Sequence, residues 1–283
     1  MSATMRETGW AKINLALHVR ARRADGYHDI ETLFAFVDGG DTIEAALAAT
    51  DALVIDGEFA EGLSSGADNL VLRVLALLRA RYGADRVPSL AVRLTKRLPV
   101  AAGIGGGSAD AAAMARLVRT HFLPELGDAT LARIVGPLGA DIAACVASTT
   151  CMGSGTGEDL HAVAGLRIAG VPVLLVNPRQ PVATGPVFAA WDGIDRGPLY
   201  IGTDYRAQLI GARNDLQRPA LAACPAISDI LLELGALRPW LARMSGSGAT
   251  CFALFDAAAD RDAAKAVLAA RHPGWWLMAG VLR

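Results

Sequence analysis

The sequence predicts a two-domain protein of mixed α/β and α+β structure, and three observations support this prediction. Hydrophobic residues make up 53% of the 283 positions and charged residues 19%, so the chain has enough apolar surface to fold compactly rather than stay disordered. The first half combines alternating, strand-like segments with helical ones. From Val171 the pattern restarts as strand, helix, helix, strand, helix and strand, which is typical of an α+β sandwich. We expect a boundary near Leu166, with domains at 1–165 and 166–283.

The N-terminal half begins with a strand. Across residues 10–19, Ile13 and Leu15 point to one face, while Lys12 and Asn14 point to the other. A helical pattern of apolar residues then follows Asp68 or Asn69, either of which is a suitable N-cap. Further strands are predicted at 30–37, 41–46, 52–55 and 90–94, and further helices end near 119 and span about 130–135. In the C-terminal half we expect strands at 171–176, 251–255 and 275–282, and helices near 185–191, 227–235 and 257–270.

Charge and cysteine content exclude several classes of function. The 27 Lys and Arg residues balance 28 Asp and Glu residues, for a net charge of −1, and no basic block is present, so we expect neither nucleic acid nor a membrane as partner. No signal peptide and no run of roughly 18 apolar residues is found. The four cysteines lack zinc-site spacing, and spacing alone identifies no metal ligand. We expect a cytoplasmic protein without disulfides that acts on a small molecule.

The least ordinary segment is the glycine-rich stretch Leu98–Asp110, which leads into an alanine-rich helix. Backbone N–H groups of such a loop, together with those of the first helical turn, can bind phosphate. The alternative is a flexible loop before an ordinary helix. The Walker loop does not fit because no lysine precedes Ser108, and the dinucleotide fingerprint does not fit because it needs a glycine at that position.

Four segments together resemble the GHMP kinases, the family of galactokinase, homoserine kinase and mevalonate kinase. Leu98–Ala112 is similar to the family's second motif, a Pro-x-x-x-Gly-x-Gly-x-Gly-Ser-like loop at a helix start. Met244–Thr250 resembles the third motif, a Gly-Ser-Gly-Ala loop that packs against the phosphate loop in the family. Ala11–Leu15 and Arg23–His28 resemble a branch whose substrate is a cytidine-diphospho sugar alcohol. The ordered set covers nearly the whole chain.

The resemblance implies a fold and an activity. The fold would be a ribosomal-protein-S5-domain-2-like N-terminal domain with a left-handed βαβ unit, followed by a ferredoxin-like C-terminal domain. The activity would be an ATP- and Mg²⁺-dependent transfer of phosphate to an alcohol in isoprenoid synthesis, by a monomer or weak homodimer. Val100–Ala102 lacks a glycine that many members have, and Asp110 replaces a small residue. These departures weaken a galactokinase or mevalonate kinase identity more than the kinase interpretation.

By the same resemblance, Lys12 and Asp141 are the catalytic pair. Asp141 would accept the proton of the substrate hydroxyl, and the Lys12 ammonium would steady Asp141 and the transferring phosphoryl group. Without the family, Lys12 reads as a solvated strand lysine and Asp141 as a helix N-cap. The N-cap interpretation is compatible with catalysis, because a carboxylate at a helix N-terminus stays ionised and oriented.

The expected nucleotide site centres on the glycine-rich stretch. Ser108 is predicted as the N-cap of the following helix and is placed near the Mg²⁺-nucleotide phosphates by the resemblance. Asn69 and Lys96 match family positions near the base and ribose, although a cap and a surface charge explain them equally. The full predicted set is Pro99, Val100, Ala101, Ala102, Gly103, Ile104, Gly105, Gly106, Gly107, Ser108, Ala109, Asn69 and Lys96.

The expected substrate site holds the cytosine. The Tyr27 ring would stack on the base and His28 would bond its edge, whereas both could also be ordinary hairpin residues. Phe188 matches a second aromatic that sandwiches the base, and its alternative is a core position. Asn14 and Thr184 complete the predicted substrate-binding set.

Two other functions stay open on the sequence. One is another small-molecule kinase of the family, of the homoserine or mevalonate kinase type. The other is a catalytically silent regulator that binds a nucleotide on the same fold, against which the presence of both Lys12 and Asp141 argues.

Overall fold

The computed structural model describes residues 4–283, which form two compact units that interleave along the chain. The first unit comprises the residues up to Ala11, Gly40–Val100 and Gly105–Ser148, and the second comprises Lys12–Gly39, Ala101–Ile104 and Thr149–Arg283. The predicted domains, 1–165 and 166–283, were continuous segments. The compact units are not continuous, and the domain boundary stays a prediction.

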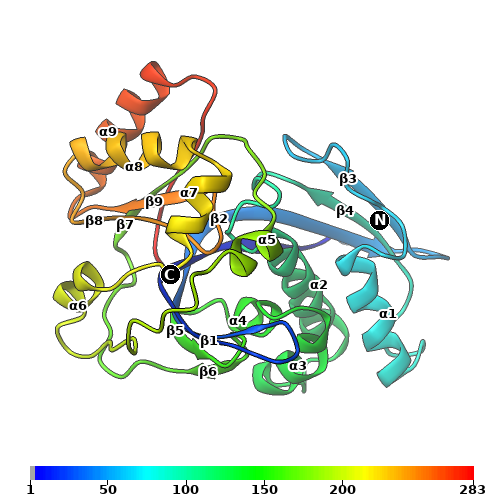
Figure 1. The fold of residues 1–283 in the computed structure, drawn as a ribbon. Helices are drawn as coiled ribbons and strands as arrows, with labels where there is room; N and C mark the ends of the chain where they lie inside the picture. The colour runs from blue at the N-terminus through cyan, green and yellow to red at the C-terminus, as the bar shows by residue number, and fades with distance from the viewer. Residues whose placement is uncertain (1–3) are drawn as a thin grey trace. The chain divides into compact units, whose positions relative to one another are not determined.

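The described residues form the strands and helices drawn in Figure 1. The strands are β1 (Met5–Arg22), β2 (His28–Leu47), β3 (Ala52–Asp56), β4 (Leu90–Thr95), β5 (Cys151–Ser154), β6 (Asp159–His161), β7 (Pro172–Asn177), β8 (Leu241–Met244), β9 (Cys251–Leu254) and β10 (Trp276–Val281). The helices are α1 (Leu70–Tyr82), α2 (Gly106–Phe122), α3 (Asp128–Val135), α4 (Ile142–Ala147), α5 (Thr184–Ala189), α6 (Tyr205–Gly211), α7 (Gln217–Ala223), α8 (Ala226–Ala236) and α9 (Ala258–Arg271), with a 3₁₀ turn at Gly136–Leu138.

The first unit packs helices around α2. The strands β3 and β4 run parallel and are joined by α1, so they form the predicted βαβ unit, and β4 also pairs antiparallel with the second half of β2. The helices α1 and α4 both pack on α2. All side chains from Ala109 to Val118 are buried, because a run of small alanines lets neighbouring helices approach closely from every side.

The long strand β2 differs from the prediction, which divided it at Gly39 and Gly40. These two glycines do not form a turn. A Cβ at Gly40 would lie 2.0 Å from the backbone oxygen of Gly9 in β1. The glycine therefore lets the backbones of β1 and β2 approach closely while β2 continues unbroken. The sequence shows the glycines but not this neighbour.

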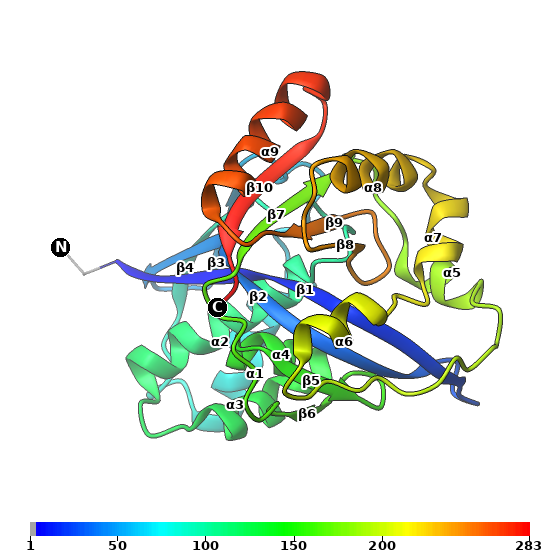
Figure 2. The same ribbon diagram turned by 90° about the vertical axis from the view of Figure 1, so that its left-hand side faces the viewer.

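The second unit contains a four-stranded antiparallel sheet in the order β10–β7–β9–β8 (Figure 2). With α8 between β7 and β8, and α9 between β9 and β10, this is the predicted ferredoxin-like half. Both helices pack on the sheet, α8 on β8 and β9 and α9 on β7 and β10. The buried core of this unit includes Leu174, Val176, Ile227, Ile230, Leu234, Phe255 and Leu268.

The short strand β8 escaped prediction because Arg243 interrupts its apolar pattern. The Arg243 side chain is nevertheless buried, and its guanidinium donates to the backbone oxygens of Leu15, Leu209 and Ala212. Burial lowers the pKa of Arg243 to about 10, which leaves it charged at neutral pH. A buried cation that is bonded to three carbonyls therefore replaces an apolar residue.

Two further expectations concern cysteines and membranes. Cys145, Cys151, Cys224 and Cys251 are all buried, and none forms a disulfide within residues 4–283. In the same part of the chain, no helix has both the length and the apolar character that crossing a bilayer requires.

Candidate active site

The glycine-rich loop ends in a left-handed turn at the start of α2. Gly103 and Gly105 have φ angles of 72° and 63°, which L side chains rarely adopt, and Gly105 is the N-cap. The first N–H groups of a helix have no partner in the helix, and over the 17 residues of α2 the aligned peptide dipoles add positive potential at this end. The start of α2 can therefore bind an anion through its backbone.

The prediction that Ser108 is the N-cap is wrong. Gly105 occupies that position, and Ser108 is the third residue of the helix. The left-handed turn at Gly105 allows the helix to begin earlier than a serine cap would. The Ser108 hydroxyl is thereby left beside the first-turn amides, where it can itself contact a bound anion.

A second glycine-containing loop packs against the first, as the resemblance implied. In the second unit, Thr250 N donates to Ala102 O at 3.1 Å, and Ser245 Oγ donates to Gly103 O at 2.8 Å. A Cβ at Gly103 would lie 2.3 Å from Ser245 O, so only glycine fits. Lys12 N donates to Ile104 O at 3.1 Å, which brings β1 to the same loop.

The first unit gathers further predicted residues around the start of α2. A Cβ at Gly107 would lie 3.8 Å from Leu70 Cδ1, so α1 begins next to α2. Asn69 is the N-cap of α1, as predicted, and its Oδ1 accepts from Val71 N at 2.9 Å. A Cβ at Gly139 would lie 3.9 Å from Ser108 Oγ, which places the segment before Asp141 close to that hydroxyl.

Asp141 occupies the N-cap position of the short helix α4, as one interpretation of the sequence predicted. Its side chain, however, makes no capping hydrogen bond. The residue is half-buried, so its carboxylate has partial access to solvent. The Asp141 carboxylate therefore does not cap α4.

Lys12 is not a solvated strand lysine. It is 4% exposed, and its ammonium donates to Asn14 Oδ1 at 3.1 Å and lies 5.0 Å from the centre of the Phe34 ring. Asn14 Nδ2 donates to Thr32 Oγ1 at 2.8 Å, and this bond fixes which end of the amide faces Lys12. Lys12 lies in the second unit and Asp141 in the first, so their approach to each other stays a prediction.

Lys96 is not a surface charge. Its side chain is 3% exposed, and its ammonium donates to the carboxylates of Asp41 and Asp110. The surface-charge interpretation of Lys96 is therefore wrong, and its position near the base and ribose of the nucleotide stays a prediction.

The structure brings His28 and Phe188 together in the second unit. Their ring centres lie 5.2 Å apart with an interplanar angle of 43°, while Tyr27 is 63% exposed beside them in the chain. Thr184, four residues before Phe188, places its Oγ1 3.0 Å from Ser247 Oγ in the second glycine-containing loop. Four predicted substrate residues and that loop therefore belong to one structural unit.

Trp191 is a residue of this cluster that the sequence did not identify. Its ring centre lies 5.8 Å from that of His28, edge-on at 83°, and its indole nitrogen is buried without a hydrogen-bond partner among the described residues. No motif or spacing in the sequence identifies Trp191. The course of the chain just after α5 places it beside His28.

Burial and the neighbouring Arg22 favour the neutral form of His28. The Arg22 Nε donates to His28 Nε2 at 3.4 Å, and its Nη2 donates to Ala189 O at 2.9 Å. Burial, and then the charge of Arg22, lower the pKa of His28 below its usual value. His28 is therefore neutral at pH 7, and because Nε2 accepts, its proton resides on Nδ1.

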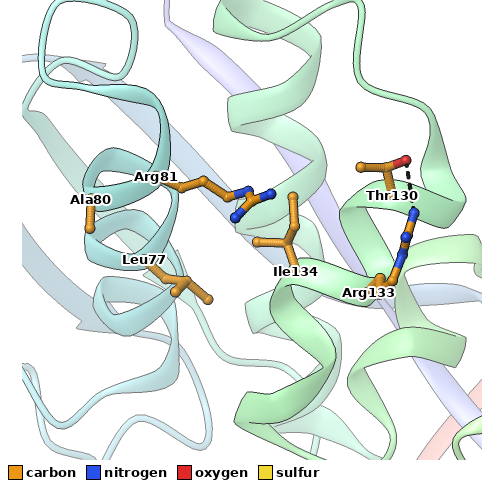
Figure 3. A pocket seen from close by; sticks show the side chains of 6 residues that line it. All are labelled: Leu77, Ala80, Arg81, Thr130, Arg133 and Ile134. Atoms are coloured by element: carbon orange, nitrogen blue, oxygen red, sulfur yellow. Dashed lines mark hydrogen bonds between the residues drawn. The ribbon is translucent and has the colours of Figure 1, made fainter.

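A hollow of about 630 Å³ lies between α1 and α3, and its lining has none of the groups that act as acid, base or nucleophile in catalysis (Figure 3). Its lining contains two arginines, Arg81 and Arg133, and no carboxylate, histidine or cysteine. Both arginines belong to the last turns of their helices, where a cation offsets the negative end of the dipole. This structural role explains them without a ligand.

Sequence comparison identifies the family. The family model of the GHMP kinases N terminal domain matches residues 69–149, and that of the GHMP kinases C terminal matches residues 205–273. The chain is 99% identical, over the full length of both chains, to the 4-diphosphocytidyl-2-C-methyl-D-erythritol kinase of Sphingopyxis alaskensis. It is 52% identical to the kinase of the same name from Novosphingobium aromaticivorans, over 99% of this chain and 93% of that one.

Solved structures agree with the sequence relatives. A crystal structure of 4-(cytidine 5'-diphospho)-2C-methyl-D-erythritol kinase matches 98% of this chain and 99% of its own, with a TM-score of 0.80 and 28% identity. A homoserine kinase from Cytophaga hutchinsonii matches with a TM-score of 0.73 at 15% identity, which shows a shared fold alone. The chain therefore belongs to the GHMP kinase family and, by its relatives, to the 4-diphosphocytidyl-2-C-methyl-D-erythritol kinases within it.

Proposed function

We propose that the protein transfers the γ-phosphoryl group of ATP to the 2-hydroxyl of 4-diphosphocytidyl-2-C-methyl-D-erythritol, giving the 2-phosphate and ADP in the non-mevalonate route to isopentenyl diphosphate. The observation that supports this substrate is the contact between the rings of a neutral His28 and Phe188 in a kinase of this family. The observation that supports nucleotide binding is the left-handed glycine turn at the start of α2.

Asp141 is the general base in this proposal. The Asp141 carboxylate, half-buried at the N-terminus of α4, would accept the proton of the attacking hydroxyl. Lys12 provides the compensating positive charge, and Asn14 and Phe34 hold its ammonium in place. Phosphoryl transfer needs little beyond alignment and charge neutralisation, so this pair and the loop amides suffice.

The residues around the loop fit an Mg²⁺–ATP complex. Mg²⁺ prefers oxygen ligands and usually keeps several waters beside one or two carboxylates and the nucleotide phosphates. The ion would arrive as the Mg²⁺–ATP complex and be held chiefly by the nucleotide phosphates, which the first-turn amides of α2 and the Ser108 hydroxyl would bind. When bound, the ion neutralises charge on the transferring group. Asn69 would border the base or ribose, because α1 begins next to α2.

The site selects cytosine through a hydrogen-bond donor, the Nδ1–H group of His28. With its proton on Nδ1, neutral His28 offers a donor to the base edge. Cytosine presents acceptors at O2 and N3, whereas uracil presents a donor at N3, so the same histidine nitrogen would oppose uracil at that position. Tyr27 and Phe188 provide the two ring faces between which a base can stack.

A substrate panel tests this function. We expect the purified protein to consume ATP with 4-diphosphocytidyl-2-C-methyl-D-erythritol in preference to its uridine analogue, homoserine and mevalonate, with the product measured by ³¹P NMR. Preference for homoserine or mevalonate would replace the proposal with another kinase of the family. ATP binding without turnover of any alcohol would identify a silent regulator instead.

The substitution Phe188→Leu tests the stacking face. Leucine keeps the apolar contact of Phe188 with the core of the second unit but removes the ring. Base stacking contributes about 1–3 kcal/mol per base, so we expect the KM for the cytidine substrate to rise by about tenfold. The KM for ATP stays unchanged in steady-state assays. Tyr200→Leu, which removes an aromatic side chain that is 74% exposed, is the matched control and leaves both KM values unchanged.

A further inference from the structure

Three ionisable side chains are buried together in the first unit, next to the start of α2. Asp41 comes from β2, Lys96 follows β4, and Asp110 belongs to α2, with exposed fractions of 0%, 3% and 4%. The Lys96 ammonium donates to Asp41 Oδ2 and, at 2.7 Å, to Asp110 Oδ2. We call these three residues the charge cluster.

The charge cluster is bonded to both ends of the glycine-rich loop. Asp41 Oδ1 accepts from the backbone N–H groups of Arg97 at 2.5 Å and Leu98 at 2.9 Å, which are the residues that open the loop. Lys96 and Asp110 are 14 residues apart, and their ion pair closes the segment that contains the loop. A Cβ on Gly106 would lie 3.5 Å from Lys96 Nζ, so the cluster lies directly beneath the first residue of α2.

We propose that the charge cluster of Asp41, Lys96 and Asp110 is the positioning element of the nucleotide site, which fixes both ends of the glycine-rich loop and sets the charge beneath the bound phosphates. The proposal rests on the function proposed above, because it assumes that ATP binds at the start of α2. None of the three side chains contacts the nucleotide. Their effect reaches it through the backbone that they hold and through the field at the helix N-terminus.

The charge of the cluster depends on Asp110. Burial, against the attraction of Lys96, raises the pKa of Asp110 to about 8. The ionisable groups that face Asp110 are Lys96 and Asp41, while β1 presents only backbone at Gly9, and the Arg97 guanidinium turns away to Thr42. The cluster therefore carries no net charge when Asp110 is protonated, and a net charge of −1 when it ionises.

This titration gives two dependences on pH. As the pH rises through about 8, a negative charge develops beneath the phosphates, so ATP binding weakens. Because the folded protein holds the Asp110 proton more tightly than the unfolded chain, the stability contribution of this group falls as the pH rises from its ordinary pKa of 3.8 to about 8. The uncharged, isosteric Asp110→Asn removes both dependences.

A buried ion pair that only stabilises the fold would act differently. Replacing it would lower stability and reduce the amount of folded enzyme, so the apparent kcat would fall while the KM values for ATP and for the cytidine substrate stayed unchanged. A positioning role separates the two substrates, because the loop binds ATP and the aromatic cluster binds the cytidine.

The experiment measures the ATP Kd by calorimetry from pH 6 to pH 9, and both KM values at pH 7, for three variants. Asp110→Asn keeps the shape and the acceptor for Lys96, and Asp110→Ala removes the bond that closes the loop. Asp128→Asn is the control, since Asp128 pairs with Arg119 at the opposite end of α2 and is well exposed.

We expect the wild-type ATP Kd to rise above about pH 8, and the Asp110→Asn Kd to stay near the wild-type pH 7 value throughout. Asp110→Ala should raise the KM for ATP about tenfold and leave that for the cytidine substrate unchanged. Asp128→Asn should behave as wild type. Equal pH profiles for wild type and Asp110→Asn, or equal effects of Asp110→Ala on both KM values, would overturn the proposal. Should ATP bind while no cytidine substrate is phosphorylated, the proposed function fails, yet the Kd profiles still decide the role of the charge cluster.

Discussion

The substitution Asp141→Asn is expected to lower kcat by at least about 10², which is typical for the loss of a general base. The amide has the shape of the carboxylate but cannot accept the proton of the substrate hydroxyl. The Asp141 side chain makes no capping hydrogen bond, so the start of helix α4 does not depend on its carboxylate. Single-turnover phosphorylation, measured by rapid quench at saturating ATP, gives the rate of the chemical step directly.

ATP binding by Asp141→Asn provides the control for this prediction. The ATP Kd, measured by calorimetry, should change little, because the backbone amides at the start of α2 are intact in Asp141→Asn. A rate constant equal to that of the wild type would remove Asp141 from the mechanism. A large loss of ATP affinity together with the rate would reassign Asp141 to nucleotide binding.

The substitution Gly103→Ala is expected to have the second largest effect. The new Cβ would lie 2.3 Å from Ser245 O and 2.8 Å from Gly248 N, and both are backbone atoms that cannot rotate away. The φ of 72° adds its own strain of about 1–2 kcal/mol. We expect the free energy of unfolding in urea to fall by at least about 3 kcal/mol, with weaker ATP binding by the folded fraction.

Gly83→Ala is the matched control for this prediction. Gly83 also has a positive φ, of 89°, but no atom lies within 4 Å of its Cβ position. With φ 89° and ψ 155°, Gly83 adopts a conformation that is nearly confined to glycine, so its alanine variant should lose about 1–3 kcal/mol from backbone strain and should bind ATP normally. If both alanine variants lose the same stability, the contact between the two glycine-containing loops is not what requires Gly103.

The sequence predicted the parts of the fold that depend on local pattern. The apolar spacing after Asn69 and the alternation around Lys12 gave α1 and β1, and the order of elements after Val171 gave the ferredoxin-like half. These patterns survive folding because each element buries the face that its own residues define. The failures arose where a distant neighbour decided the local structure, as Gly9 does for the unbroken β2 and three carbonyls do for Arg243.

The site shows the same division. The prediction of an anion site at the glycine-rich loop followed from three adjacent glycines before a helix, and the loop geometry supports it. Ser108 was misplaced by three positions, because a sequence does not reveal that Gly105 adopts a left-handed turn and caps the helix. The burial of Lys96 and the contact of Trp191 with His28 could not be predicted without tertiary contacts, since their partners lie at least 14 residues away.

The proposed mechanism requires that the start of α2 bind the triphosphate of ATP within reach of Lys12 and Asp141. A crystal structure with a non-hydrolysable ATP analogue and the cytidine substrate tests this claim directly. We predict phosphate oxygens on the backbone amides of Gly106–Ala109, with the Lys12 ammonium and the Asp141 carboxylate both facing the γ-phosphate. Phosphates bound away from the α2 N-terminus, or either of those two side chains turned away from the γ-phosphate, would contradict it.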